Sequence, residues 1–133
     1  TELTRVDPAF AVVGQDEGRE LPLTPETQFS LRGRYEWETA NGDAYAQLGM
    51  KYASKALNSI VDTADEPNTY QKAYTIVDAA TGVRNVRNNW GMELYIKNLT
   101  DERAQLHINR QDFFERVTTN RPRTVGLRIS YDF

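Results

Sequence analysis

Several features are absent from this chain of 133 residues, and each absence narrows what it can be. It has no cysteine, which excludes disulfide bonds and thiolate metal sites. No apolar run reaches the length of about 20 residues that a membrane-spanning helix needs. The chain also lacks an excess of positive charge. Its net charge is -3, whereas a phosphate-binding surface must be strongly basic, so we expect no nucleic acid partner.

The residue combinations of common active sites are missing as well. The sequence has no nucleophile–base arrangement, no phosphate-binding glycine loop and no paired catalytic carboxylates. His107 is the only histidine, and no other metal-ligating residue lies near it at a suitable spacing. We therefore expect a protein that is not an enzyme, with no catalytic residue, no cofactor and no metal site.

The most informative feature that is present is the alternation at the end of the sequence. Residues 124–133 place apolar side chains at every second position: Val125, Leu127, Ile129, Tyr131 and Phe133. Side chains of a strand point alternately to opposite faces, so this segment has one apolar and one polar face. A last strand of an outer-membrane barrel needs this pattern, with lipid on one face and a polar lumen on the other. The low mean hydropathy of -0.67 is compatible, because barrel strands place only alternate residues toward lipid.

Similar alternation predicts further strands along the chain. The predicted strands cover residues 28–37, 44–52, 73–80, 90–97, 104–109 and 124–133. Residues 73–80 are strand-like in composition, but the sequence does not show which of their side chains share a face. Asn41-Gly42 is typical of a tight hairpin between the first two. The predicted fold class is all-β: an antiparallel up-and-down meander of about six strands, forming the C-terminal part of a transmembrane β-barrel. Residues 1–26 are predicted to be a connecting segment or the end of a preceding strand, and residues 27–133 to form the barrel strands.

The placement of aromatic residues bears on whether the apolar face meets lipid. With strand directions alternating along the predicted meander, the aromatics gather at two rims: Tyr35, Trp37 and Trp90 at one, and Phe29, Tyr52, Tyr131 and Phe133 at the other. Membrane barrels carry such aromatic girdles. Two other classes stay open on periodicity alone. One is a soluble ligand-binding barrel of lipocalin type, and the other is a structural or adhesive β-sandwich.

Several segments, in this order, resemble one family. The residues Asn98-Leu99-Thr100-Asp101-Glu102 follow a strand that begins with Trp90, and Arg121-Pro122-Arg123 leads into the final strand. Leu21-Pro22-Leu23-Thr24-Pro25 and Tyr74-Thr75-Ile76-Val77-Asp78-Ala79 fit the same pattern. Together they resemble the C-terminal barrel segment of TonB-dependent outer-membrane receptors. Such receptors have a barrel of about 22 strands and an N-terminal plug domain, which these residues do not contain.

The resemblance implies energised uptake of a scarce nutrient, such as an iron–siderophore complex, at the outer membrane of a Gram-negative bacterium. It also implies the partners: outer-membrane lipid, the remaining barrel strands, the plug domain, TonB acting through the missing N-terminal part, the barrel-assembly machinery and a small-molecule ligand. The assembly machinery is expected to read Val125, Leu127, Ile129, Tyr131 and Phe133 as its signal.

Two groups of residues are the candidate sites. Charged residues on the polar faces are expected to line the lumen and to pair across strands or with a plug: Arg32, Arg34, Lys51, Glu93, Lys97, Arg128 and Asp132. Simple solvation of these charges is the alternative. The loop at 110–122 combines aromatic and cationic residues that suit an anionic or aromatic ligand: Arg110, Phe113, Phe114, Arg116 and Arg121. Packing of its phenylalanines on neighbouring strands is equally compatible with the sequence.

Strand counting gives an orientation with one internal conflict. If the chain ends in the periplasm, as in the family, 110–122 is extracellular and 98–102 is a periplasmic turn. The same count places the long connection 54–72 in the periplasm, although barrels keep their long loops outside. Either residues 57–61 extend a strand, or the count of strands is wrong.

Overall fold

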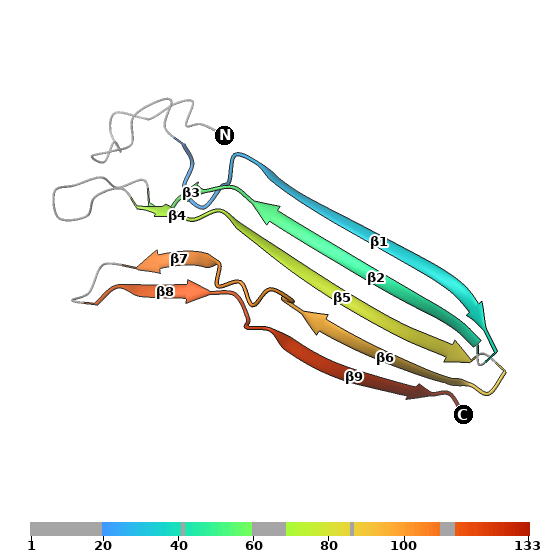
Figure 1. Ribbon diagram of the computed structural model, residues 1–133. Coiled ribbons are helices and arrows are strands. Elements are labelled where there is room, and N and C mark those ends of the chain that lie inside the picture. Colours follow the sequence, from blue (N-terminus) through green and yellow to red (C-terminus); the bar gives the residue numbers. More distant parts are fainter. Residues whose placement is uncertain (1–19, 41, 60–68, 86, 110–113) are drawn as a thin grey trace. The chain divides into compact units, whose positions relative to one another are not determined.

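The computed structural model describes residues 20–40, 42–59, 69–85, 87–109 and 114–133. Its main element is a five-stranded sheet with the strand order β1-β2-β5-β6-β9. The strands are β1 (Gln28–Thr39), β2 (Gly42–Ala53), β5 (Tyr74–Asn85), β6 (Trp90–Lys97) and β9 (Thr124–Tyr131). Neighbouring arrows point in opposite directions (Figure 1), so the predicted all-β antiparallel meander is confirmed. The described residues contain no apolar helix of membrane-spanning length.

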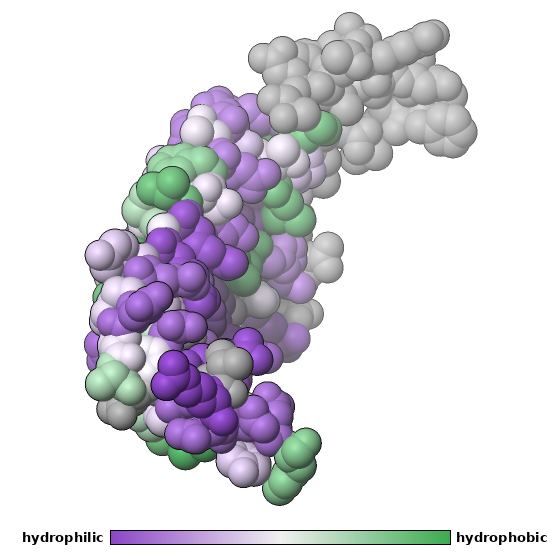
Figure 2. Space-filling model, turned by 90° about the vertical axis from the view of Figure 1, so that its right-hand side faces the viewer, coloured by the Kyte–Doolittle hydropathy of each residue, from purple (hydrophilic) through white to green (hydrophobic). Residues whose placement is uncertain are grey.

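The register of the sheet separates its two faces. In the β6–β9 pair, Leu94 lies opposite Leu127, while Glu93 lies opposite Arg128 on the other face. The apolar side chains remain uncovered, with Leu127 at 58% and Ile129 at 70% exposure. In the view of Figure 2 most of the visible surface is hydrophilic, with smaller groups of hydrophobic residues among it. A sheet that leaves its apolar face uncovered needs an apolar medium or partner against it.

One predicted strand lies outside this sheet. The segment predicted at 104–109 forms β7 (Gln105–Asn109), which pairs with β8 (Arg116–Thr119) in a separate two-stranded hairpin. Strand β6 therefore pairs directly with β9, so the main sheet holds five of the six segments that the sequence predicts as strands. The parity of 73–80 was also unresolved in the sequence. Strand β5 extends to Asn85, with Gly82 opposite Glu93 on the polar side.

The corrected count removes the conflict in the loop lengths. Short turns join β1 to β2 and β5 to β6 at one end of the sheet (Figure 1). The long connections 54–73 and 98–123 both leave from the opposite end. The segment 98–102 is thus not a turn at the end opposite to 110–122, because both belong to one long connection. This one-sided distribution of loops is the pattern of outer-membrane barrels.

The same correction moves the last aromatic residues to the other rim. The sequence predicts Tyr131 at the rim with Phe29 and Tyr52. In the structure Tyr131 lies directly opposite Trp90, at the other end of the sheet. Phe29 and Tyr52 do share the far end, as the sequence predicts, and their ring centres lie 5.3 Å apart. The reason is the number of strands. With one strand fewer in the sheet, β9 runs opposite to the direction predicted for the last strand.

The long connections form a compact unit of their own. They contain β3 (Ala56–Leu57), which pairs with β4 (Tyr70–Gln71), and the β7–β8 hairpin. Leu57 is 3% exposed and Ile108 is 5% exposed, and Ala53, Ala56 and Ala104 are buried with them. Among the described residues, this unit holds all the buried apolar side chains except Ala44. The connections therefore have the core that the sheet lacks.

The end of β6 is fixed by the Asn98–Glu102 segment. Asn98 is 4% exposed and adopts a left-handed φ of 54°, a conformation that asparagine tolerates better than most residues. Its side-chain nitrogen donates hydrogen bonds to the carbonyl oxygens of Glu102 at 2.9 Å and Arg121 at 3.0 Å. Its side-chain oxygen accepts from the Glu102 N–H at 2.9 Å. These bonds join the end of β6 to the segment that leads into β9.

Candidate functional site: the polar sheet face and the long connections

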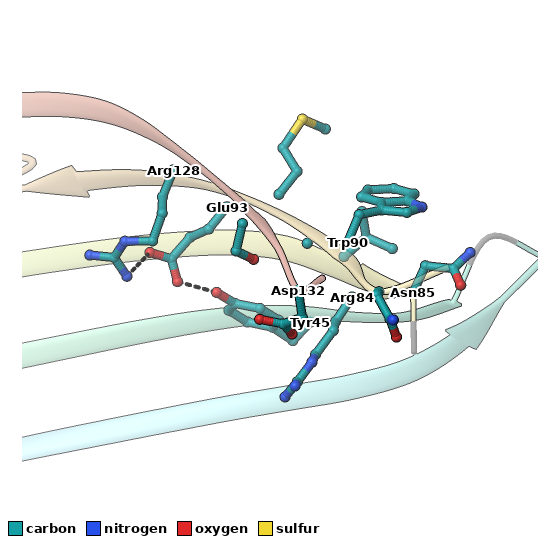
Figure 3. Close-up of a pocket in the computed structure, with 12 residues that line it drawn as sticks. Tyr45, Arg84, Asn85, Trp90, Glu93, Arg128 and Asp132 are labelled. Atoms are coloured by element: carbon teal, nitrogen blue, oxygen red, sulfur yellow. Dashed lines mark hydrogen bonds and ion pairs between the residues drawn. The ribbon is translucent and has the colours of Figure 1, made fainter. Parts of the chain in front are cut away.

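Glu93 is the centre of an interaction network on the polar face of the sheet. Its Oε1 accepts a hydrogen bond from Arg128 Nη1 at 3.0 Å, and its Oε2 accepts one from the hydroxyl of Tyr45. Figure 3 shows the Glu93 carboxylate between these two groups. On β1, the guanidinium of Arg34 lies 3.8 Å from the centre of the Tyr45 ring. The network thus connects β1, β2, β6 and β9.

A glycine on β5 makes this network possible. Tyr45 on β2 must cross β5 to reach Glu93 on β6, and the residue of β5 opposite Glu93 is Gly82. A Cβ atom at position 82 would lie 2.8 Å from Cε1 of Tyr45, closer than real contacts allow. Gly126 has the same relation to Tyr95, whose Cε1 would lie 2.8 Å from an added Cβ. Both glycines leave space for tyrosine rings that lie across a neighbouring strand.

The other polar-face charges have less extensive contacts. Lys97 Nζ lies 3.1 Å from Asp78 Oδ2, while Asp78 Oδ1 accepts the backbone N–H of Asn98. Arg32 and Lys51 are exposed and have no side-chain hydrogen bond or ion pair with the described residues. Asp132 lines a cavity of about 350 Å³ together with Glu93 and Arg128. Alternation along the strands places the predicted charges within β1, β2, β6 and β9 on this one face, whereas Asp132 follows the end of β9.

The predicted ligand-contact residues are only partly described. Arg110 and Phe113 lie outside the described residues. Phe114 is 75% exposed, close to the start of β8, and Arg116 is exposed on β8 itself. Arg121 is exposed in the segment before β9, and its carbonyl oxygen is held by Asn98. The described members therefore all belong to one long connection, 98–123.

Two buried amides were not recognised in the sequence as site residues. Asn58 is 9% exposed and Gln71 is 8% exposed, both within the 54–73 connection. The side-chain oxygen of Asn58 accepts the N–H of Ile108 at 2.8 Å, and its side-chain nitrogen donates to the oxygen of Ile108 at 2.5 Å. Gln71 Nε2 donates to Asn58 Oδ1 at 3.2 Å and to the oxygen of Leu106 at 3.0 Å. No periodic signal marks such residues, because their partners on β7 lie 35 and 50 positions away.

Comparison with known proteins identifies the family. Residues 3–99 match the family described as TonB dependent receptor-like, beta-barrel. The chain belongs to the TonB-dependent receptor β-barrel family. It is 30% identical over 121 residues to the catecholate siderophore receptor Fiu of Escherichia coli strain K12, and equally to Fiu of Escherichia coli O157:H7. The match covers 91% of this chain and 15% of each receptor.

A solved structure supports the same fold. The ferric yersiniabactin uptake receptor FyuA from Yersinia pestis matches with a TM-score of 0.75 and 17% identity, over 91% of this chain and 18% of that chain. This chain therefore spans less than a fifth of the receptors that it matches. The predicted resemblance to TonB-dependent receptors is confirmed, and the relatives are named as receptors and not as enzymes.

Proposed function

We propose that these strands form part of the wall of an outer-membrane receptor for TonB-dependent uptake of a scarce nutrient, with an iron–siderophore complex as the first candidate. The names of the relatives support this ligand class, since one is a catecholate siderophore receptor and another is a ferric yersiniabactin uptake receptor. In this proposal TonB acts through a part of the receptor that these residues do not contain. The barrel-assembly machinery pairs with β9 and reads the alternating apolar residues from Val125 to Phe133.

The single observation that carries the proposal is the division of the sheet into two unlike faces. The apolar face is uncovered over its length, from Leu31 at 66% exposure on β1 to Ile129 at 70% on β9. Membrane lipid would cover that face, with aromatic side chains near both ends. The opposite face carries the Glu93 network, whose charges suit a water-filled lumen or the polar surface of a plug domain.

The loop distribution supports an orientation. Long loops of outer-membrane barrels are extracellular and short turns are periplasmic. We accordingly assign both long connections to the outside, and the turns after β1 and β5 to the periplasm. The exposed Phe114 and Arg116 would then be available to a ligand arriving from the medium. Aromatic rings and guanidinium groups both suit an anionic or aromatic chelate.

An uptake measurement tests this function. Cells that express the complete receptor are supplied with radioactive iron(III) bound to a tris-catecholate chelator, under iron limitation. We expect accumulation in TonB-proficient cells and surface binding without accumulation in TonB-deficient cells. Equal accumulation with and without TonB would contradict energised uptake. Absence of binding to this chelate, with binding of a different nutrient, would contradict the siderophore assignment alone.

A further inference from the structure

The two long connections are joined by side-chain amides and not by a continuous sheet. Asn58 follows β3, and Ile108 lies in β7, 50 positions later in the sequence. The amide of Asn58 bonds to both the N–H and the carbonyl oxygen of Ile108. A neighbouring strand residue would satisfy Ile108 through its own backbone in the same way. Asn58 therefore replaces a strand pairing between β3–β4 and the β7–β8 hairpin.

Gln71 extends this joint by two residues along β7, from Ile108 to Leu106. Its side-chain nitrogen bonds to the carbonyl oxygen of Leu106 and to the side-chain oxygen of Asn58. The backbone N–H of Asn58 donates to the oxygen of Thr69 at 2.8 Å, which fixes Asn58 against β4. We call the side chains of Asn58 and Gln71 together the amide clasp.

Burial strengthens the hydrogen bonds of the amide clasp. Both amides are more than nine-tenths buried, next to Leu57 and Ile108, so water cannot readily replace a lost partner. Leu23 N–H also bonds to the oxygen of Leu57 at 2.7 Å, which adds the segment before β1 to the same body. An exposed surface contact between loops would be far weaker than bonds in this setting.

We propose that Asn58, with Gln71, is a positioning residue for ligand binding: it holds the β7–β8 hairpin, which carries Arg116, in the arrangement that the ligand recognises. This inference rests on the proposed function. Neither amide touches the ligand in this account. A loop that is already held in the binding arrangement loses little conformational entropy when the ligand binds. If the loop is loosened, the apparent affinity becomes the intrinsic affinity multiplied by the fraction of time that the loop spends in the binding arrangement.

Distance measurements test the positioning without a ligand. Because the described chain has no cysteine, spin labels can be attached through Lys72→Cys beside β4 and Thr118→Cys on β8, both exposed. The distribution of label distances in the complete receptor should be narrow, and Asn58→Ala should broaden it. Gln71→Leu is a second variant that preserves side-chain bulk and should broaden it less. Gln105→Ala is the control, since Gln105 on β7 has no side-chain hydrogen bond with the described residues.

Binding of iron(III) tris-catecholate is measured on the same variants. Asn58→Ala should weaken apparent affinity about tenfold, as expected if the competent arrangement falls to about a tenth of the population. The maximal rate of TonB-dependent uptake and the amount of folded receptor should be unchanged. A narrow distance distribution in both clasp variants would overturn the proposal, and so would a broadened one with unaltered affinity. A wild-type receptor that binds no such chelate would overturn the proposed function, while the distances would still decide the role of Asn58.

Discussion

Two substitutions at neighbouring positions of β9 test which face of the sheet lies against lipid. Leu127 lies on the apolar face opposite Leu94, and both side chains are about half exposed, at 58% and 46%. Arg128 lies on the opposite face. Leu127→Arg should cost about 2–4 kcal/mol of folding free energy, the range for arginine on the lipid face near the middle of a bilayer.

The matched change, Arg128→Leu, should have a much smaller effect. It removes an ion pair with Glu93 whose side chains are 69% and 26% exposed, and exposed pairs contribute about 0–1 kcal/mol. Glu93 retains its hydrogen bond from Tyr45, so its carboxylate is not left without a partner. The two variants are adjacent in sequence, which makes each the control for the other.

Folding of the complete receptor into phospholipid vesicles, followed during urea titration, gives both free energies. The folded form is recognised by its heat-dependent mobility in gels. A loss of several kcal/mol for Leu127→Arg and less than about 1 kcal/mol for Arg128→Leu is expected. Equal losses in both variants would refute the assignment of faces, and a larger loss for Arg128→Leu would invert it.

Four other substitutions test three separate features. Gly126→Ala should destabilise the barrel by about 1–3 kcal/mol in the same titration, because its methyl group would collide with the ring of Tyr95. Gly33→Ala has no atom within 4 Å of the new Cβ and should change stability by less than about 0.5 kcal/mol, and a similar loss in both would contradict the packing argument. Asn98→Ala should cost about 2–4 kcal/mol through its buried hydrogen bonds, and retention of the wild-type urea midpoint would exclude that role. Phe133→Asp should lower the outer-membrane abundance of the receptor and leave ligand affinity unaltered, whereas normal abundance with lost affinity would place the chain end beside the ligand.

Much of the sheet could be predicted from sequence because alternation is a local property. In β9 and β6, each apolar position follows the last by two residues, so the two faces are visible before any partner is known. The tight turn before Gly42, with its φ of 128°, is equally local. Family resemblance then supplied the membrane context that alternation alone leaves open.

The segment 104–109 was predicted as a strand of the main sheet and lies outside it, for a physical reason. Residues 105–109 alternate as a barrel strand does, but β7 is too short to accompany the eight residues of β6 and pairs with β8 instead. Alternation does not reveal the partner of a strand, and the direction of β9 depends on that partner. The rim assigned to Tyr131 and the side assigned to 98–102 were wrong as a consequence.

In the candidate sites too, local alternation predicts the face on which a residue lies, and the fold decides its partner. Glu93 and Arg128 could be placed on one face from period 2, whereas the link from Tyr45 across Gly82 depends on register between three strands. The amide clasp was invisible because Asn58 and Gln71 look like ordinary loop residues. Only the fold brings them to Leu106 and Ile108.

The central claim, that the sheet separates lipid from an aqueous lumen, is tested most directly by a spin-label scan along β9. Labels are placed singly at positions 124, 125, 127, 128, 129 and 130 of the complete receptor in vesicles, and collisions with oxygen and with a water-soluble nickel chelate are measured. Oxygen, which concentrates in lipid, should dominate at Val125, Leu127 and Ile129. The nickel chelate should dominate at Thr124, Arg128 and Ser130. Loss of this alternation, or nickel access at the apolar positions, would contradict the membrane-wall account.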